Sequence, residues 1–267
     1  RTKEINYQKL LIEHKNREIT DSINYAKGIQ DSILPSINEI KKVWKDLFIF
    51  FKPKDIVSGD FYWFKQINSE EFLIACADCT GHGVPGGFMS MICSDKLNDA
   101  TRESTNPDKI LYLANNSIKE TLRQQSEGKS KDGMEICLIK VNVKTKEVIY
   151  AGANRHLWII ESGSNEVKEL KPNKASIASF TEFNYSYEAT TLKLKAGDSL
   201  YLTSDGYPDQ FGGPDGKKYM SKNFKNYLLA INSTPMHQQE KMLRDNIINW
   251  MGQHEQVDDL LVIGIKL

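Results

Sequence analysis

The 267-residue sequence lacks several features that mark particular classes of protein. Neither charge is in excess, because 35 Lys and Arg residues balance 35 Asp and Glu residues. Without a basic excess or a basic block, binding to nucleic acid or to a membrane surface is disfavoured. No hydrophobic run approaches the length of a membrane span, and no signal peptide is visible. The chain begins at Arg1 without a Met, so we interpret it as a fragment of a longer protein.

Cysteine is also scarce, with four residues at positions 76, 79, 93 and 137. Cys76 and Cys79 form a CxxC pair, which could be half of a zinc site or a redox pair. Zinc would need a second pair at matching spacing, and Cys93 and Cys137 do not form one. We therefore interpret the pair as small apolar residues near a strand end. Four cysteines without a pattern are typical of a reducing compartment, so we expect a cytoplasmic protein or the cytoplasmic part of a larger sensor.

Residues 1–34 are rich in charge and predict one long helix that ends at Pro35. One apolar series recurs every seven residues, which is the coiled-coil period. The second series of a coiled-coil seam is mostly polar. Two interpretations stay open, a parallel dimer seam and a helix that lies on its own domain. We assign residues 1–45 to a linker helix. The two series are Ile5, Ile12, Ile19, Ala26 and Ile33, and Gln8, Lys15, Ser22 and Ile29.

The sequence pattern changes in residues 46–267, where short β-like apolar runs alternate with turn-like breaks. Several runs are close enough in sequence to form hairpins, so we expect mainly antiparallel sheets. Two helical stretches, about 85–125 with a break near Pro107 and about 221–253, interrupt the runs. Strands and helices in separate blocks indicate the α+β class. The expected strands are 47–51, 61–67, 71–77, 135–143, 147–153, 157–162, 199–204 and 260–267.

Acidic residues stand where several of these apolar runs begin or end. They are Asp60, Asp78, Asp205 and the pair Asp258 and Asp259. One Asp beside a Gly is normally a turn residue or a helix cap. As a set they suggest more, because buried carboxylates need cations or hydrogen-bond donors, and no Arg or Lys is adjacent to Asp78 or Asp205. Divalent metal ions would supply the charge, and all-oxygen ligands favour Mg²⁺ or Mn²⁺.

Four motifs in this order resemble the metal-dependent protein phosphatases, and within them the bacterial SpoIIE/RsbU-type serine/threonine phosphatase domain. They are GDFYW at 59–63, ADCTGHGVPGGFMSM at 77–91, AGDSLYLTSDG at 196–206 and DDLLVIGIKL at 258–267. The resemblance covers residues 46–267, and INYAKGIQDSILP before them is similar to the linker helix of sensor-linked members. It implies two packed antiparallel sheets flanked by helices, an αββα sandwich, with metal ions in the channel between the sheets.

The resemblance also implies roles for single residues. Asp60 and Asp78 match the acids at the catalytic centre, with Asp78 bridging two Mn²⁺ or Mg²⁺ ions, and Asp132 is a candidate ligand of a third ion. Lys52 and Lys54 are candidate stand-ins for a phosphate-binding Arg that relatives carry near the N-terminus, and Asn154 is a candidate substrate contact. His82 is not assigned as the general acid, because it lies two places beyond the position that relatives use. The implied metal ligands are Asp60, Asp78, the Cys79 carbonyl, Asp205 and Asp258.

The implied activity is hydrolysis of phosphoserine or phosphothreonine by a metal-activated water. The implied substrate is a phosphorylated bacterial regulatory protein such as an anti-sigma-factor antagonist. The N-terminal helix would dimerise the domain or transmit a signal, and residues 207–220 predict a mobile loop near the site. A binding module that kept the fold without turnover is the alternative. A two-metal nuclease uses similar chemistry, but the zero net charge argues against it.

Overall fold

The computed structural model describes residues 2–124 and 130–267 and contains two antiparallel sheets. Sheet A has the strand order β1-β13-β10-β6-β7, and sheet B has the order β2-β3-β4-β5-β9, with β8 paired to β4. The strands of sheet A are β1 (Leu47–Lys52), β6 (Leu157–Ile160), β7 (Lys168–Leu170), β10 (Ser199–Thr203) and β13 (Leu260–Lys266). The strands of sheet B are β2 (Asp60–Gln66), β3 (Glu71–Cys79), β4 (Gly133–Asn142), β5 (Glu147–Ala153), β8 (Ile177–Ala178) and β9 (Ala189–Lys193).

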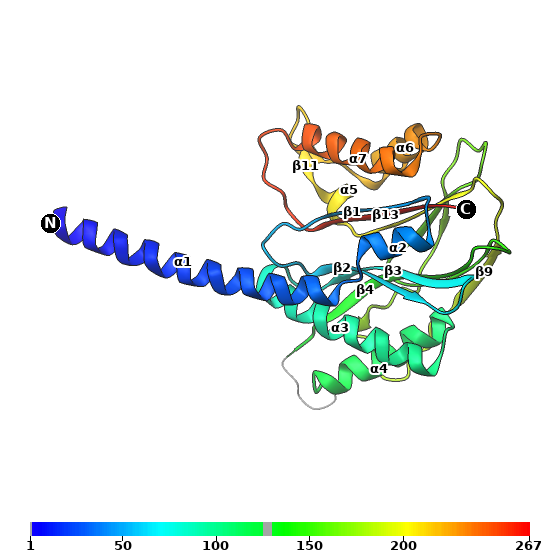
Figure 1. Cartoon of the computed structure of the whole chain (residues 1–267), viewed down its shortest axis with the longest axis horizontal. Helices are drawn as coiled ribbons and strands as arrows, with labels where there is room; N and C mark the ends of the chain where they lie inside the picture. Colours follow the sequence, from blue (N-terminus) through cyan, green and yellow to red (C-terminus); the bar gives the residue numbers. More distant parts are fainter. Residues whose placement is uncertain (1, 125–129) are drawn as a thin grey trace.

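The two sheets lie face to face, and helices cover both outer faces (Figure 1). Helices α6 and α7 pack on sheet A, and α3 and α4 pack on sheet B. The predicted α+β class and αββα sandwich are therefore confirmed. Within the described residues, no helix combines the length and the apolar character needed to cross a membrane. The helices are α1 (Thr2–Ile33), α2 (Ile37–Val43), α3 (Gly83–Glu103), α4 (Pro107–Thr121), α5 (Gly206–Asp209), α6 (Ser221–Ile231) and α7 (Met236–Met251).

Strand β3 shows why the apolar runs are nearly continuous. Successive side chains of a strand point to opposite faces. Ile74 and Cys76 pack between the two sheets, while Leu73 and Ala75 pack against α3 and α4. Both faces of the strand are buried, so every position in its centre is apolar. The sandwich thus has three apolar layers, one between the sheets and one under each helical layer.

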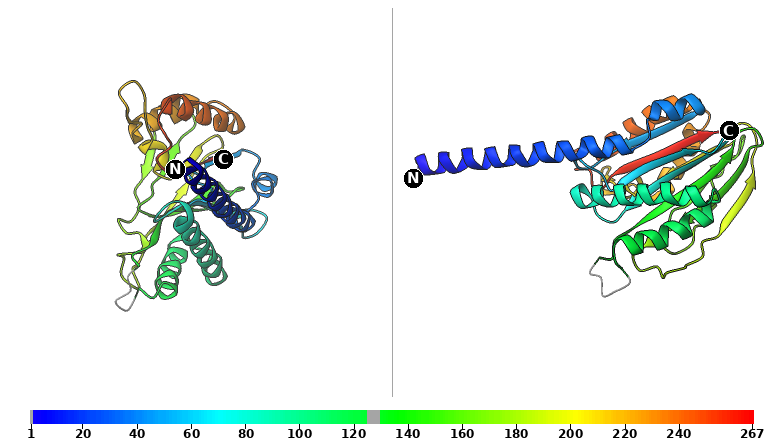
Figure 2. Two further views of the ribbon diagram at one scale, coloured as in Figure 1. Left: turned by 90° about the vertical axis from the view of Figure 1, so that its left-hand side faces the viewer. Right: turned by 60° about the horizontal axis from the view of Figure 1, so that its bottom comes forward.

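Helix α1 extends away from the sandwich (Figures 1 and 2). Every residue from 2 to 22 is exposed, so the interpretation that this part lies on its own domain is wrong. The predicted dimer seam stays a prediction. The end of α1 does pack on the body, because the buried Gln30 amide donates to the Ser58 carbonyl at 2.7 Å and to Ser90 Oγ at 2.9 Å. Ser58 N–H donates back to Gln30 Oε1 at 3.1 Å.

Two expectations for the C-terminal third need correction. The stretch 221–253 is not one helix, because residues 232–235 separate α6 from α7 and Pro235 precedes the first turn of α7. The predicted mobile loop 207–220 is partly core, since Tyr207 and Tyr219 are buried under α6 and α7. Both phenol groups donate to Asn246 Oδ1, at 3.0 and 2.8 Å, which satisfies their polar ends. The short strands β11 (Phe211–Gly212) and β12 (Lys217–Lys218) form a hairpin between them.

Candidate active site

Three acidic residues form a row across the end of sheet B. Asp60 begins β2 and lies opposite Asp78 near the end of β3, and Asp78 lies opposite Glu135 on β4. Residues directly opposite each other in antiparallel strands point to the same face. That face is the inner one, because Cys76 and Cys137 on the same side of β3 and β4 belong to the layer between the sheets. The three carboxyl groups therefore point into the channel between the sheets.

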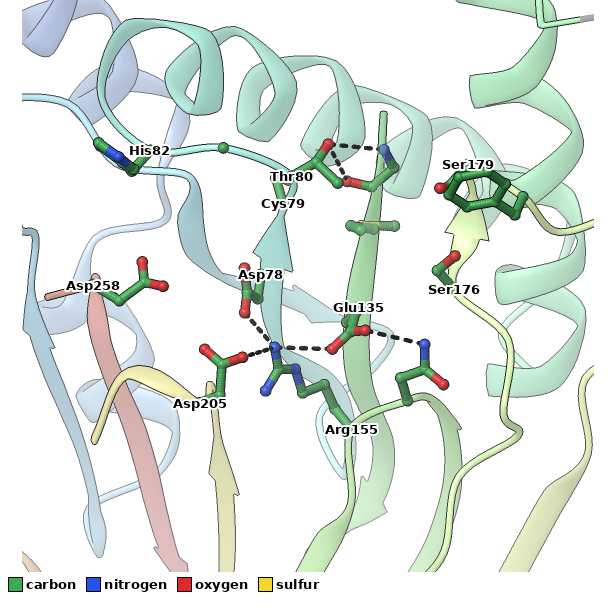
Figure 3. Close-up of a pocket in the computed structure, with 15 residues that line it drawn as sticks. Asp78, Cys79, Thr80, His82, Glu135, Arg155, Ser176, Ser179, Asp205 and Asp258 are labelled. Atoms are coloured by element: carbon green, nitrogen blue, oxygen red, sulfur yellow. Dashed lines mark hydrogen bonds and ion pairs between the residues drawn. The ribbon is translucent and has the colours of Figure 1, made fainter. Parts of the chain in front are cut away.

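Sheet A brings two more acids to the same end of the channel. Asp205 follows β10 by two residues, and Asp258 precedes β13 by two residues. These strands are antiparallel neighbours, so the end of one and the start of the other lie at the same edge. Asp78, Asp205 and Asp258 line one cavity of about 530 Å³. Figure 3 shows the three side chains around this cavity.

The turn after β3 is built from glycines because the backbone is crowded there. A Cβ on Gly86 would overlap the carbonyl oxygen of Gly81 and meet the Cα of Gly59. Gly81 and Gly83 adopt φ values of 84° and 62°, in the left-handed region that favours glycine. The glycine-rich turn thus lets the start of α3 approach the loop before Asp60 closely.

Asp259 anchors that loop from the other sheet. Its Oδ2 accepts hydrogen bonds from the backbone N–H groups of Gly59 at 2.8 Å and Asp60 at 3.2 Å, and its Oδ1 accepts from Lys54 N–H at 2.8 Å. Asp259 is buried, so its charge is satisfied by these backbone donors. Of the DD pair at 258–259, one residue lines the cavity and the other fixes the position of Asp60.

Arg155 lies among the acids, although no Arg or Lys is adjacent to Asp78 or Asp205 in the sequence. Its Nη2 pairs with Asp78, with Asp205 at 2.9 Å and with Glu135 at 2.9 Å (Figure 3). Arg155 belongs to the connection between β5 and β6, far in sequence from its partners. Sequence reasoning missed Arg155, because it searched for cations only beside each acid. It also passed over Glu135, although this residue begins the expected strand 135–143.

The electrostatics of the cluster reflect burial and mutual repulsion. Burial raises the pKa of Asp60 well above its ordinary value, and the carboxylates of Asp78 and Asp259 add to the effect. Burial also raises the pKa of Asp78 to about 7, with Arg155 opposing the rise and Asp205 and neighbouring acids supporting it. Burial would lower the pKa of Arg155, but the carboxylates around it raise the value, so the guanidinium stays charged.

The donor set fits a hard divalent cation. Its side-chain ligands would be carboxylate oxygens, and Oδ2 of Asp60 is buried with no hydrogen-bond partner among the described residues. In residues 2–124 and 130–267, no three His, Cys, Asp or Glu side chains already stand in the geometry of a metal site. The guanidinium of Arg155 lies between the carboxylates instead. An ion would therefore take over partners that Arg155 now has.

The remaining candidates take different positions. Asn154 lines the cavity and donates to Glu135 Oε1 at 3.0 Å. Asp132 accepts hydrogen bonds from Thr80 Oγ1 at 3.0 Å and from Ser130 Oγ at 2.6 Å. Asp132 itself does not line the cavity, and its role at a third ion stays a prediction. The Lys54 side chain is also absent from the cavity lining, whereas its backbone anchors to Asp259.

The CxxC pair is not a chelating pair. Cys76 packs between the sheets, and Cys79 packs on the opposite face of β3 against α3 and α4. All four cysteines are unpaired and buried. Burial raises the pKa of the Cys79 thiol, so the group stays neutral. The interpretation of the pair as small apolar residues is confirmed, and only the backbone of Cys79 is a candidate ligand.

His82 precedes α3 and lines the cavity. Its Nδ1 lies 2.7 Å from Asp55 Oδ2, which ties the glycine-rich turn to the loop between β1 and β2. Both side chains are about half exposed, so the pair contributes little to stability. The contact fits a role in holding the turn.

Comparisons with known proteins agree with this architecture. The model of the family described as Stage II sporulation protein E (SpoIIE) matches residues 68–267. The chain is similar to the SiaA-PP2C domain of Pseudomonas aeruginosa, with 29% identity and a TM-score of 0.86 over 95% of this chain and 98% of that one. Comparison with curated proteins gave no match.

Two further solved structures show likeness in fold. The PP2C phosphatase domain with a regulatory fragment of SpoIIE from Bacillus subtilis has 20% identity and a TM-score of 0.66, over 83% of this chain and 63% of that one. The RsbU and RsbW domains of a Mycobacterium tuberculosis protein have 13% identity and a TM-score of 0.64, over 83% of this chain and 59% of that one.

Proposed function

This chain belongs to the SpoIIE family of metal-dependent protein phosphatase domains, and we propose that it is a protein serine/threonine phosphatase. One observation carries the proposal. Four acids from two sheets, namely Asp60, Asp78, Asp205 and Asp258, converge at one end of the channel between the sheets. Arg155 offsets only part of the charge of these acids, and a bound cation would offset the rest. A cation site in an open cavity suits the hydrolysis of a phosphate ester.

These residues would hold Mn²⁺ or Mg²⁺, with Asp78 shared between two ions and the Cys79 carbonyl completing the set. When bound, the divalent ions lower the pKa of a water molecule and neutralise charge on the phosphoryl group. Asp60 and Asp78 sit in register on adjacent strands, so the sheet fixes their separation. Asp259 and the glycine-rich turn hold the loops that carry them. Asp132 is the candidate ligand of a third ion.

The substrate we propose is a phosphoserine or phosphothreonine on a bacterial regulatory protein, such as an anti-sigma-factor antagonist. The fold likeness to RsbU and RsbW domains supports this class of partner. Lys54 and Asn154 are the proposed substrate contacts from sequence, and Asn154 is the one that lines the cavity. We also propose a cytoplasmic site of action, which the four unpaired cysteines support.

Regulation through α1 is part of the proposal. Exposed apolar side chains along the helix, including Ile5, Ile12 and Ile19, would form the seam of a homodimer. The end of the same helix contacts the loop that precedes Asp60 through Gln30. A change in how α1 packs would therefore reach the candidate metal ligands through two residues of backbone.

The test is hydrolysis of p-nitrophenyl phosphate and of phosphoserine and phosphotyrosine peptides, with and without Mn²⁺. We expect Mn²⁺-dependent release that favours phosphoserine over phosphotyrosine and is lost in Asp78→Asn. Asp215→Asn is the matched control, because that carboxylate is exposed and outside the cavity lining. Release that is independent of metal, or that survives Asp78→Asn, would contradict the proposal.

A second candidate is a binding module without turnover. The observation that favours it is the ion pairing of Arg155 with Asp78 and Asp205, which supplies a counter-charge from the chain itself. Measurable Mn²⁺ binding with no turnover of any phosphopeptide at high protein concentration would favour this candidate. Metal-dependent turnover would eliminate it.

A further inference from the structure

Arg155 is the only Lys or Arg among the described residues that line the cavity. Its side chain is 12% exposed, so it is mostly buried with its head group among the acids. The backbone at this position is fixed, because the buried Tyr150 donates its phenol hydrogen to the Arg155 carbonyl at 2.7 Å. A fixed backbone with a long side chain lets the guanidinium change partners within the cavity without movement of the strands.

The guanidinium uses only part of its hydrogen-bonding capacity. All three carboxylates pair with the same nitrogen, Nη2. Nε is buried and has no partner among the described residues. Nη1 carries no interaction in Figure 3. A buried arginine with donors left over beside an open cavity is equipped to bind an anion, and the planar group matches two oxygens of a phosphate.

Its three partners are not equivalent. Asp78 and Asp205 belong to the proposed ligand set, whereas Glu135 does not. Asn154 donates to Glu135 Oε1, which leaves Oε2 to pair with Arg155. If cations take Asp78 and Asp205, Glu135 still holds the guanidinium at the edge of the same cavity. The arginine, which lines the cavity, then has more free donors than before.

We propose that Arg155 binds the phosphoryl group of the substrate, and that Glu135 is the positioning residue that retains Arg155 when the other two carboxylates bind cations. The inference rests on the phosphatase function proposed above. It assigns recognition of the phosphate to the connection between β5 and β6, rather than to Lys54 in the loop between β1 and β2.

Two measurements test the inference. Calorimetry with inorganic phosphate, in the presence of Mg²⁺, measures the anion site directly and does not depend on turnover. Kinetics with p-nitrophenyl phosphate and Mn²⁺ give KM and kcat. The variants are Arg155→Ala, Arg155→Lys and Glu135→Gln. Arg102→Ala is the matched control, because that arginine is exposed and pairs with Asp99 on α3, outside the cavity lining. Circular dichroism and Mn²⁺ titration check that each variant folds and binds metal.

We expect Arg155→Ala to weaken phosphate binding about 10- to 100-fold, the range for loss of hydrogen bonds to a charged group. KM should rise in parallel, and Mn²⁺ should bind at least as tightly, because a competing positive charge is gone. Arg155→Lys should fall between Arg155→Ala and the wild type, since lysine keeps the charge without the planar pair of donors. Glu135→Gln should weaken phosphate binding by a smaller factor.

Unchanged phosphate affinity in Arg155→Ala would overturn the inference, and so would a loss of Mn²⁺ binding that accounts for the whole effect. If Arg155→Ala does not fold, Arg155→Lys tests the inference instead. A phosphate affinity of Arg155→Lys equal to that of the wild type would refute the role of the planar guanidinium group. A wild type without turnover that still loses phosphate affinity on Arg155→Ala would refute the phosphatase function and leave the anion site standing.

Discussion

Metal-free protein should lose stability as the pH rises from about 4 to about 7, because of Asp78. Burial raises the pKa of this carboxyl from 3.8 to about 7 in the folded state. Between the two values the folded protein holds a proton that the unfolded chain has released, so the free energy of unfolding falls as the pH rises. A pKa difference of roughly 3 corresponds to about 4 kcal/mol in total, of which about 2 to 3 kcal/mol lies between pH 5 and pH 8.

The assay is urea unfolding in EDTA at several pH values, for the wild type and for Asp78→Asn. The asparagine does not titrate, so the difference between the two proteins isolates this group. We expect Asp78→Asn to gain about 2 to 3 kcal/mol relative to the wild type between pH 5 and pH 8. In melting temperature this is a relative shift of about 5 to 10 °C for a domain of this size. Saturating Mn²⁺ should remove the penalty at pH 8 in the wild type alone.

Asp215→Asn is again the matched control, since its carboxylate is exposed and lies outside the cavity lining. A wild-type stability that stays level with that of Asp78→Asn across this range would refute the reasoning. An opposite slope would show that Arg155 outweighs burial and stabilises the ionised carboxylate. Either result would also remove the electrostatic case for a cation at this position.

Three further variants test the contact between α1 and the body, the glycine-rich turn and the exposed part of α1. Gln30→Leu should destabilise the protein by about 1 to 3 kcal/mol in urea unfolding and weaken Mn²⁺ binding, because the backbone groups of Ser58 would lose their buried partner. Gly86→Ala should reduce metal-dependent activity and lower the free energy of unfolding by about 1 to 3 kcal/mol, because the added methyl group overpacks the turn. Gly28→Ala in α1 is the control: it has open space around it and should raise the free energy of unfolding by about 0.5 to 1 kcal/mol. Ile19→Pro should break α1 and change both the mass measured by sedimentation and the rate of hydrolysis, while Mn²⁺ binding stays intact. An unchanged sedimentation mass and an unchanged rate would count against the dimer seam.

The sequence predicted the acidic half of the site because those residues are visible from strand boundaries. Asp60 and Asp78 flank apolar runs, and antiparallel pairing brings such boundaries together. Arg155 was not predictable in the same way, since its partners Asp78 and Asp205 are 77 and 50 residues away in sequence. Glu135 begins the expected strand 135–143, but an acid in a strand ordinarily faces solvent, so the sequence alone does not mark it as part of the site.

Most helices and strands of the fold were also predictable from the sequence. Long apolar runs predicted the central strands, and the break near Pro107 separated α3 from α4 as expected. The helical pattern over 221–253 predicts one stretch, whereas the chain breaks before α7, and Pro235 is the sequence signal of that break. The polar composition of 207–220 predicts an exposed loop. In the structure, Tyr207 and Tyr219 of this segment are buried, and Gly213 lies against the Trp250 ring.

The pairing of β1 with β13 has a consequence for the order in which the protein is made. β1 covers residues 47–52, and its partner covers residues 260–266, which also follow directly on Asp258 and Asp259. Ribosomes add roughly 5 to 20 residues per second, so about 200 residues separate the two strands by roughly 10 to 40 s. During that interval sheet A lacks an inner strand, and the loop before Asp60 lacks its anchor. A growing chain therefore cannot fix the loop before Asp60 until β13 has been synthesised, so the proposed activity should begin only after that point.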